Sequence, residues 1–97
     1  MATYCVLGSF TEQGVRNAKD SPKRAEAFKE MARKCGVTVK DVYWAQGQYD
    51  VVTILEASDE LAVTSLALSV GALGNIRTQT LRLFSAGEMK AIIEKMA

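Results

Sequence analysis

The feature that most constrains this sequence is a pair of strand-like runs between Val42 and Leu55, separated by Gly47-Gln48. β-Branched and aromatic residues dominate both runs, which is typical of strands. A glycine at the junction suits a tight turn, although Gly-Gln is not the strong Asn-Gly type. The stretch also contains the only tryptophan and two of the three tyrosines. It predicts a β-hairpin at the centre of the fold.

The first third of the chain reads as a strand followed by a helix. Thr3–Phe10 is apolar on both alternating faces, which is typical of a central strand in a covered sheet. Ser21-Pro22 marks a helix start, with an N-cap hydroxyl before a proline in the first helical position. That helix ends at Gly36. Apolar residues do not recur at a regular spacing in residues 11–20, so this segment forms either a functional loop or irregular turns of helix.

The last third repeats the helix and strand pattern. Ser58-Asp59-Glu60 begins a helix that ends before Gly74, and Ile76–Phe84 predicts the last strand. The middle helix is apolar nearly all the way round, so it must be covered on more than one side. A Ser85-x-x-Glu88 capping box then starts a final helix, whose apolar stripe either supplies that second cover or reaches a partner chain. The stripe consists of Met89, Ile92, Ile93 and Met96.

The order βαββαβ followed by a helix predicts an α+β fold of the ferredoxin-like type, formed as one domain by residues 1–97. Its four-stranded antiparallel sheet would have helices on one face and apolar side chains on the other. A monomer does not leave such a patch exposed to water. We therefore expect two sheets to pack face to face in a dimeric α/β barrel, with a second copy of the chain as partner.

Composition excludes several classes of function. Twelve basic and eleven acidic residues leave a charge of +1, so the chain lacks the clustered Lys and Arg of a nucleic-acid binder. It contains no histidine, which removes the usual general base, haem ligand and zinc ligand. Cys5 and Cys35 are too few for a disulfide framework or a thiolate zinc cage. We expect no metal and no cofactor.

Nothing in the sequence indicates a membrane protein. No stretch approaches the roughly 20 apolar residues that a membrane span requires. Thr3 and Tyr4 enter a strand pattern at once, without the basic segment and long apolar run of a signal peptide. We therefore expect a cytoplasmic protein with no membrane partner.

Tyr49 and Asp50 follow the hairpin turn and are the first candidates for a ligand site. A structural interpretation accounts for both, because Asp at a turn accepts backbone N–H bonds and Tyr packs its ring. In the functional interpretation, Asp50 faces a ligand or an arginine. The arginines considered are Arg16, Arg77 and Arg82.

Other candidates lie in the first loop and on the strands. Arg16, Asn17 and Lys19 are either solvated or form a cradle for a carboxylate or phosphate. Trp44 belongs to an aromatic set that either packs in the core or lines a pocket. The other members of the set are Tyr4, Phe10 and Tyr43. Arg77 and Arg82 are five residues apart, which places them on opposite faces of their strand.

The segment Gly47-Gln48-Tyr49-Asp50 resembles the Gly-x-Tyr-Asp motif of the GYD domain family. The family's first loop is similar to residues 11–17 and 19–24, its second strand to Tyr43-Trp44, and its helix-to-strand junction to residues 73–78. The family is small, bacterial and archaeal, and has no settled activity. It is similar in fold to the ligand-binding domains of Lrp/AsnC-type regulators, which form dimeric α/β barrels. The resemblance supports this architecture and implies no catalytic residue.

Three functions fit these observations. The first is a binding or sensing module that holds a small anionic or aromatic metabolite at the barrel mouth or the subunit interface. The second is a small cofactor-independent enzyme of the isomerase or oxygenase type, which would need a carboxylate or phenol in a closed cavity. The third is a structural assembly subunit, which the apolar middle helix would suit.

Overall fold

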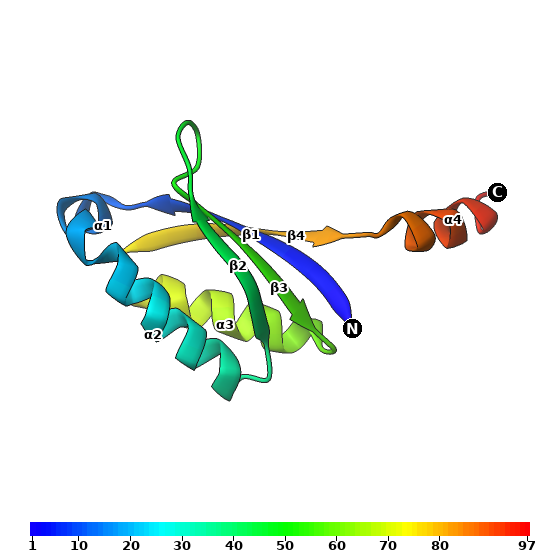
Figure 1. Ribbon diagram of the computed structural model, residues 1–97, viewed down its shortest axis with the longest axis horizontal. Coiled ribbons are helices and arrows are strands. Elements are labelled where there is room, and N and C mark those ends of the chain that lie inside the picture. Colours follow the sequence, from blue (N-terminus) through cyan, green and yellow to red (C-terminus); the bar gives the residue numbers. More distant parts are fainter.

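The computed structural model describes residues 1–97 as a four-stranded antiparallel sheet with two long helices across one face (Figure 1). The strands run across the sheet in the order β2-β3-β1-β4, so that β1 and β3 are central. Their bounds are β1 (Ala2–Phe10), β2 (Thr38–Trp44), β3 (Val51–Ala57) and β4 (Ile76–Leu83). The predicted α+β class and antiparallel sheet are confirmed.

The helices differ in how they meet the sheet. α2 (Ser21–Lys34) and α3 (Glu60–Ala72) lie side by side over one face, with the short α1 (Glu12–Arg16) at one end of it (Figure 1). A 3₁₀ turn (Ala18–Asp20) joins α1 to α2. α4 (Ala86–Glu94) projects beyond β4, away from the rest of the molecule. None of these helices is long and apolar enough to cross a membrane.

Residues 11–20 adopt the second of the two forms that the sequence left open, as irregular turns of helix. The Thr11 side chain caps α1 by accepting a hydrogen bond from the Gly14 N–H. The start of α2 is shifted by one residue from the expected position. Asp20 is the N-cap and Ser21 is the first helical residue, so the Ser21 hydroxyl is free for another contact.

The core lies between α2, α3 and the face of the sheet that they cover. Leu55 and Leu66 are its largest fully buried side chains, 1% exposed each. Burying an aliphatic side chain of this size contributes about 1.5–3 kcal/mol to folding. The remaining core residues are Tyr4, Val6, Ala32, Val37, Ala57 and Val63.

The other face of the sheet is not covered by any element of the chain. Strand register places Cys5 between Ile54 and Leu81 on this face, because side chains alternate along a strand and Tyr4 and Val6 face the core. Burial raises the pKa of the Cys5 thiol. We call this surface the open face. Its apolar members are Cys5, Leu7, Tyr43, Val52, Ile54, Leu81 and Leu83.

The expectation that α3 is covered on more than one side fails within the single chain. Val63 and Leu66 face the core, whereas Leu61 and Leu68 are 75% and 70% exposed on the outer side. α4 does not supply the missing cover, since it extends away from α3 (Figure 1). Of the two roles expected for the α4 stripe, only contact with a partner chain stays open.

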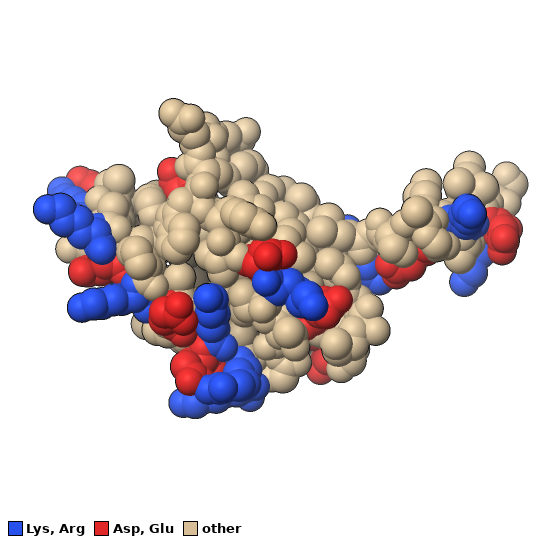
Figure 2. Space-filling view, viewed as in Figure 1, with Lys and Arg blue, Asp and Glu red and all other residues tan.

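Charged side chains of both signs are mixed over the face shown in Figure 2. Lys and Arg alternate with Asp and Glu around α1 and α2, and α4 also carries both signs. The two ion pairs within α2 join residues about one turn apart, Glu26 to Lys29 and Glu30 to Arg33. Such exposed pairs contribute little to stability. This face has the mixed charge that the composition predicts.

Gly14 should be the glycine most sensitive to substitution, since a Cβ there would overlap the backbone carbonyl of Asn75. We expect Gly14→Ala to lower the free energy of unfolding by about 1–3 kcal/mol, as overpacking against a backbone group does. Gly71→Ala is the matched control, because a Cβ at Gly71 in α3 meets nothing within 4 Å. That variant should be unchanged or slightly stabilised. Urea denaturation measures both, and equal stability of the two variants would contradict the packing described.

Candidate functional site

Asp50 joins the hairpin to the central strand. Its carboxylate Oδ2 accepts a hydrogen bond of 2.8 Å from the Phe10 N–H, and its own N–H donates to the Gly8 carbonyl at 2.8 Å. Its carbonyl accepts a further bond of 2.7 Å from the Ala45 N–H. The half-buried carboxylate therefore holds the end of β1, as the structural interpretation of this residue requires.

Tyr49 faces a different strand from Asp50. Its hydroxyl donates a hydrogen bond of 2.7 Å to Oε1 of Gln79 on β4. Gln79 pairs with Leu7 on the open face, so Tyr49 reaches over one end of that face. Together Tyr49 and Asp50 attach the hairpin to β4 and to β1.

The first loop does not bring its polar residues to Asp50. Arg16 pairs with Glu12 at 2.6 Å, and both side chains are exposed. The Asn17 amide donates to the Gln13 carbonyl at 3.0 Å, and Lys19 is exposed. Asp50 takes part in none of the ion pairs of the chain. Binding of an anion by Arg16, Asn17 and Lys19 stays a prediction.

The two arginines of β4 occupy opposite faces, as their spacing predicts. Arg77 pairs with Ser9 on the open face, whereas Arg82 pairs with Tyr4 on the other. The Arg82 guanidinium lies 4.4 Å from the centre of the Phe84 ring and 5.7 Å from that of Tyr4. Arg82 also bonds Glu88 at 3.1 Å. Arg82 therefore supports the start of α4 rather than the region around Asp50.

Glu88 completes the capping box predicted from the sequence. Ser85 and Glu88 exchange side-chain to backbone hydrogen bonds at 3.0 and 3.1 Å. The backbone N–H of Ser85, and then the Arg82 guanidinium, lower the pKa of the Glu88 carboxyl. This anchor fixes where α4 begins and the direction in which it leaves β4.

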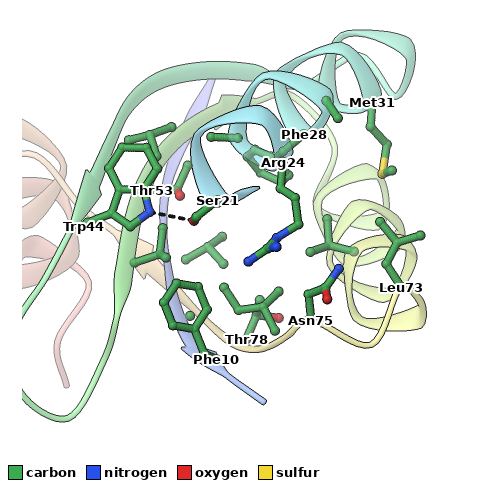
Figure 3. A pocket seen from close by; sticks show the side chains of 18 residues that line it. Phe10, Ser21, Arg24, Phe28, Met31, Trp44, Thr53, Leu73, Asn75 and Thr78 are labelled. Carbon is green, nitrogen blue, oxygen red and sulfur yellow. Dashed lines mark hydrogen bonds between the residues drawn. The ribbon is translucent and has the colours of Figure 1, made fainter. Parts of the chain in front are cut away.

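A cavity of about 140 Å³ lies between the sheet and the two long helices (Figure 3). Phe10, Trp44, Phe28, Met31 and Leu73 contribute apolar walls from several parts of the chain. The remaining lining is mostly aliphatic. The cavity is partly open to solvent. A mostly apolar pocket with a few polar groups in its lining is the usual form of a small-molecule site, so this cavity is the candidate functional site.

Trp44 closes one side of the cavity. Its indole N–H donates a hydrogen bond of 2.8 Å to the Ser21 hydroxyl, which links the end of β2 to the first residue of α2 (Figure 3). The four aromatic residues that the sequence suggested as a set do not all lie together, because the sheet places them on both of its faces. Phe10 and Trp44 line the cavity, Tyr4 is in the core, and Tyr43 lies on the open face.

Arg24 lines the cavity, although a charged side chain in a helix is usually solvated. Its guanidinium donates to the carbonyls of Asn17 at 2.8 Å and Gly14 at 3.3 Å. One signal could have identified it, since Arg24 precedes Phe28, which packs against the core, by four residues, or one helical turn. Ser21 is three residues earlier on the same side.

The chemistry of the lining favours binding over acid–base catalysis. No carboxylate, thiol or phenol is among the lining residues, and the polar ones are Ser21, Arg24, Thr53, Asn75 and Thr78. A general base needs a group that can accept a proton within hydrogen-bond reach of the substrate. The chain also contains no group of three side chains placed to hold a metal ion. The arrangement can enclose a small apolar molecule and bond it through hydroxyl, amide or guanidinium groups.

Replacing Asp50 should test its structural role. In Asp50→Ala the half-buried Phe10 N–H loses its partner, which should lower the free energy of unfolding by about 1–3 kcal/mol. Asp50→Asn retains an oxygen acceptor and should lose less than about 1 kcal/mol. Urea denaturation followed by Trp44 fluorescence measures both. An alanine variant as stable as the wild type would show that this hydrogen bond does not hold β1.

Two solved structures resemble this one. TTHA0845 from Thermus thermophilus matches with a TM-score of 0.58 and 25% sequence identity, over 89% of this chain and 96% of that one. MtbAldR matches with a TM-score of 0.60 and 15% identity, over 87% of this chain, which shows a shared fold alone. This chain spans 52% of the length of MtbAldR.

Sequence comparison identifies the family. A protein of Thermus thermophilus, named glutamine synthetase and cystathionine beta-lyase binding protein, is 32% identical over 92 residues. The alignment covers 94% of this chain and 97% of that protein. Residues 4–93 match the model of the GYD domain. The chain therefore belongs to the GYD domain family.

Proposed function

We propose that this chain is a non-catalytic binding domain, which docks α4 onto a partner protein and forms a homodimer through its open face. The observation that carries the proposal is the form of α4. Three exposed apolar side chains, Met89, Ile92 and Ile93, occupy one stripe of a helix that is held away from the rest of the molecule (Figure 1). In this proposal the domain acts by contact with other proteins.

The α4 stripe has the spacing of a docking helix. Met89, Ile92 and Ile93 stand at positions i, i+3 and i+4 of α4 and are 48%, 36% and 53% exposed. Met96, which is 71% exposed, follows just after the helix ends. This is the pattern by which amphipathic helices anchor in an apolar groove of a partner. α4 has nine residues. An isolated helix needs about 12–15 residues to be even marginally stable in water. Contact with a partner would supply the missing stability.

The relative from Thermus supports protein partners of an enzymatic kind. Its name gives two unlike enzymes, glutamine synthetase and cystathionine beta-lyase, as the proteins that it binds. A surface that accepts two different partners must repack, and methionine is the apolar side chain most suited to repacking. Met89 is the first residue of the α4 stripe, and Met96 follows just after the helix ends. We propose enzymes of this kind as partners of this chain.

The open face supports self-association. Its apolar side chains extend across all four strands, and large exposed apolar patches mark association sites. A second copy of the same sheet presents the same patch and can cover it isologously. Face-to-face packing of two ferredoxin-like sheets would form a dimeric α/β barrel. This assembly would also bury Ile54 and Val52 at the centre of the contact.

A second role, binding of a small metabolite, is favoured by the cavity beside Trp44. Its apolar walls suit an aromatic or aliphatic molecule better than an anion. In this role the domain would sense a metabolite and alter what it presents to a partner. The cavity and the open face are on opposite sides of the sheet, so dimerisation would leave the cavity accessible.

The dimer can be tested with a single charge on the open face. Wild-type protein should sediment at twice the chain mass of 10.6 kDa at micromolar concentration. Ile54→Lys should weaken the dimer by at least about 100-fold, or about 2.7 kcal/mol, because the charge would be buried unpaired. Leu68→Lys on the outer side of α3 is the control and should remain dimeric. A monomeric wild type, or an Ile54→Lys dimer of unchanged affinity, would contradict this assembly.

Docking of α4 can be tested against the two enzymes named for the relative, taken from the organism that encodes this chain. Biolayer interferometry should detect binding of at least one of them at micromolar concentration. Ile93→Glu should weaken binding by at least about tenfold, since it places a charge on the apolar stripe. Ala91→Glu adds the same charge to the opposite side of α4 and should bind like the wild type. Equal loss in both variants, or no binding by the wild type, would refute the proposed docking helix.

A further inference from the structure

We propose that the cavity beside Trp44 binds a neutral phenol or another compact apolar alcohol, and that the Thr53 hydroxyl recognises its oxygen. This inference deepens the small-molecule role proposed above, on which it rests. It is independent of dimer formation and of the α4 docking site.

The size of the cavity sets the size of its ligand. Its volume of about 140 Å³ is close to that of an apolar cavity of about 150 Å³ that stays dry and binds benzene. Phe10, Phe28 and Met31 supply flat and adaptable apolar surfaces around it. A six-membered ring with one small substituent matches this space.

Thr53 supplies the polar feature that distinguishes this cavity from a packing defect. It is 5% exposed and lies on β3 between Val6 and Val42, which also line the cavity. Its hydroxyl makes no hydrogen bond within the chain, whereas every fully sealed polar side-chain atom has a partner. The hydroxyl therefore faces the open volume of the cavity. A ligand oxygen in the cavity could therefore exchange a hydrogen bond with this hydroxyl.

Ser21 places a second hydroxyl near the same end of the cavity. It is 8% exposed and accepts the indole N–H of Trp44 at 2.8 Å, which leaves its own O–H free to donate (Figure 3). Thr53 and Ser21 both lie close to Trp44, whereas Arg24, Asn75 and Thr78 line other parts of a cavity whose walls are mostly apolar. The two hydroxyls beside Trp44 and the apolar walls match the hydroxyl and the ring of a phenol.

The charge state of the ligand follows from Arg24. Its guanidinium is the only charged group in the lining, and it already donates to the carbonyls of Gly14 and Asn17. Two of its five N–H donors are therefore in use. A carboxylate ligand would have to lose its hydration among mostly apolar walls, which costs more free energy than burying a neutral alcohol. The structure therefore favours a neutral hydroxyl over an acid.

The test compares two probes of nearly equal shape, 4-fluorophenol and 4-fluorotoluene, by ¹⁹F NMR titration of the full chain. The wild type should bind both, with the phenol about tenfold tighter, as expected for one net hydrogen bond. Thr53→Val removes the hydroxyl and should reduce phenol affinity to that of the toluene. Thr80→Val is the matched control, because Thr80 faces the same side of the sheet on β4 without lining the cavity.

A further variant distinguishes loss of the hydroxyl from loss of the folded structure. Thr53→Ser keeps the hydroxyl and should keep the preference for the phenol. Backbone amide spectra of each variant report whether it is folded. Equal affinity of the wild type for both probes would overturn recognition by Thr53 while retaining small-molecule binding by the cavity. Binding of neither probe at millimolar concentration would overturn both this inference and the small-molecule role.

Discussion

The structure depends on a central strand that is apolar on both faces and covered on only one. β1 pairs with β3 and β4, and places Tyr4 and Val6 against the helices but Cys5 and Leu7 on the open face. A chain of 97 residues supplies two long helices, which are enough to cover one side of a four-stranded sheet. The apolar surface that is left is of the kind that marks association sites in other proteins. The proposed dimer follows from this surface.

Most of the architecture could be predicted because its signals are local. The strand at Thr3–Phe10, the helix that begins near Ser21-Pro22 and the Ser85 capping box each involve neighbours in sequence, and the structure confirms each of them. The expectation that both faces of the sheet are covered is wrong for the single chain, because its two long helices lie on the same face. The placement of α4 could not be predicted in this way. Its stripe fits any apolar surface, and only the geometry at the end of β4 shows that it extends away from α3 (Figure 1).

The candidate site was less accessible to sequence reasoning, because its polar contacts join residues far apart in the chain. Trp44 bonds Ser21 across 23 positions, and Ser21 had a plausible local role as a helix cap. Arg24 has a charge that normally indicates solvent, yet its guanidinium bonds two backbone carbonyls beside the cavity. Thr53 is one of several threonines in strands. It differs from the others in that it is buried beside the cavity and its hydroxyl makes no hydrogen bond within the chain. Such features follow from tertiary packing, and neither the composition nor the spacing of apolar residues along the sequence reveals them.

The Gly-x-Tyr-Asp segment gains a specific structural meaning from the cavity. Gly47 has a φ of +112°, which favours glycine, and so allows the hairpin to turn. Asp50 then accepts hydrogen bonds from the N–H groups of Phe10 and Ala45, one through its carboxylate and one through its carbonyl. Phe10 and the neighbour of Ala45, Trp44, are the two aromatic walls that the sheet contributes to the cavity. A single residue of the motif thus fixes the backbone at both walls, and the motif would influence binding by shaping the cavity without contacting its ligand.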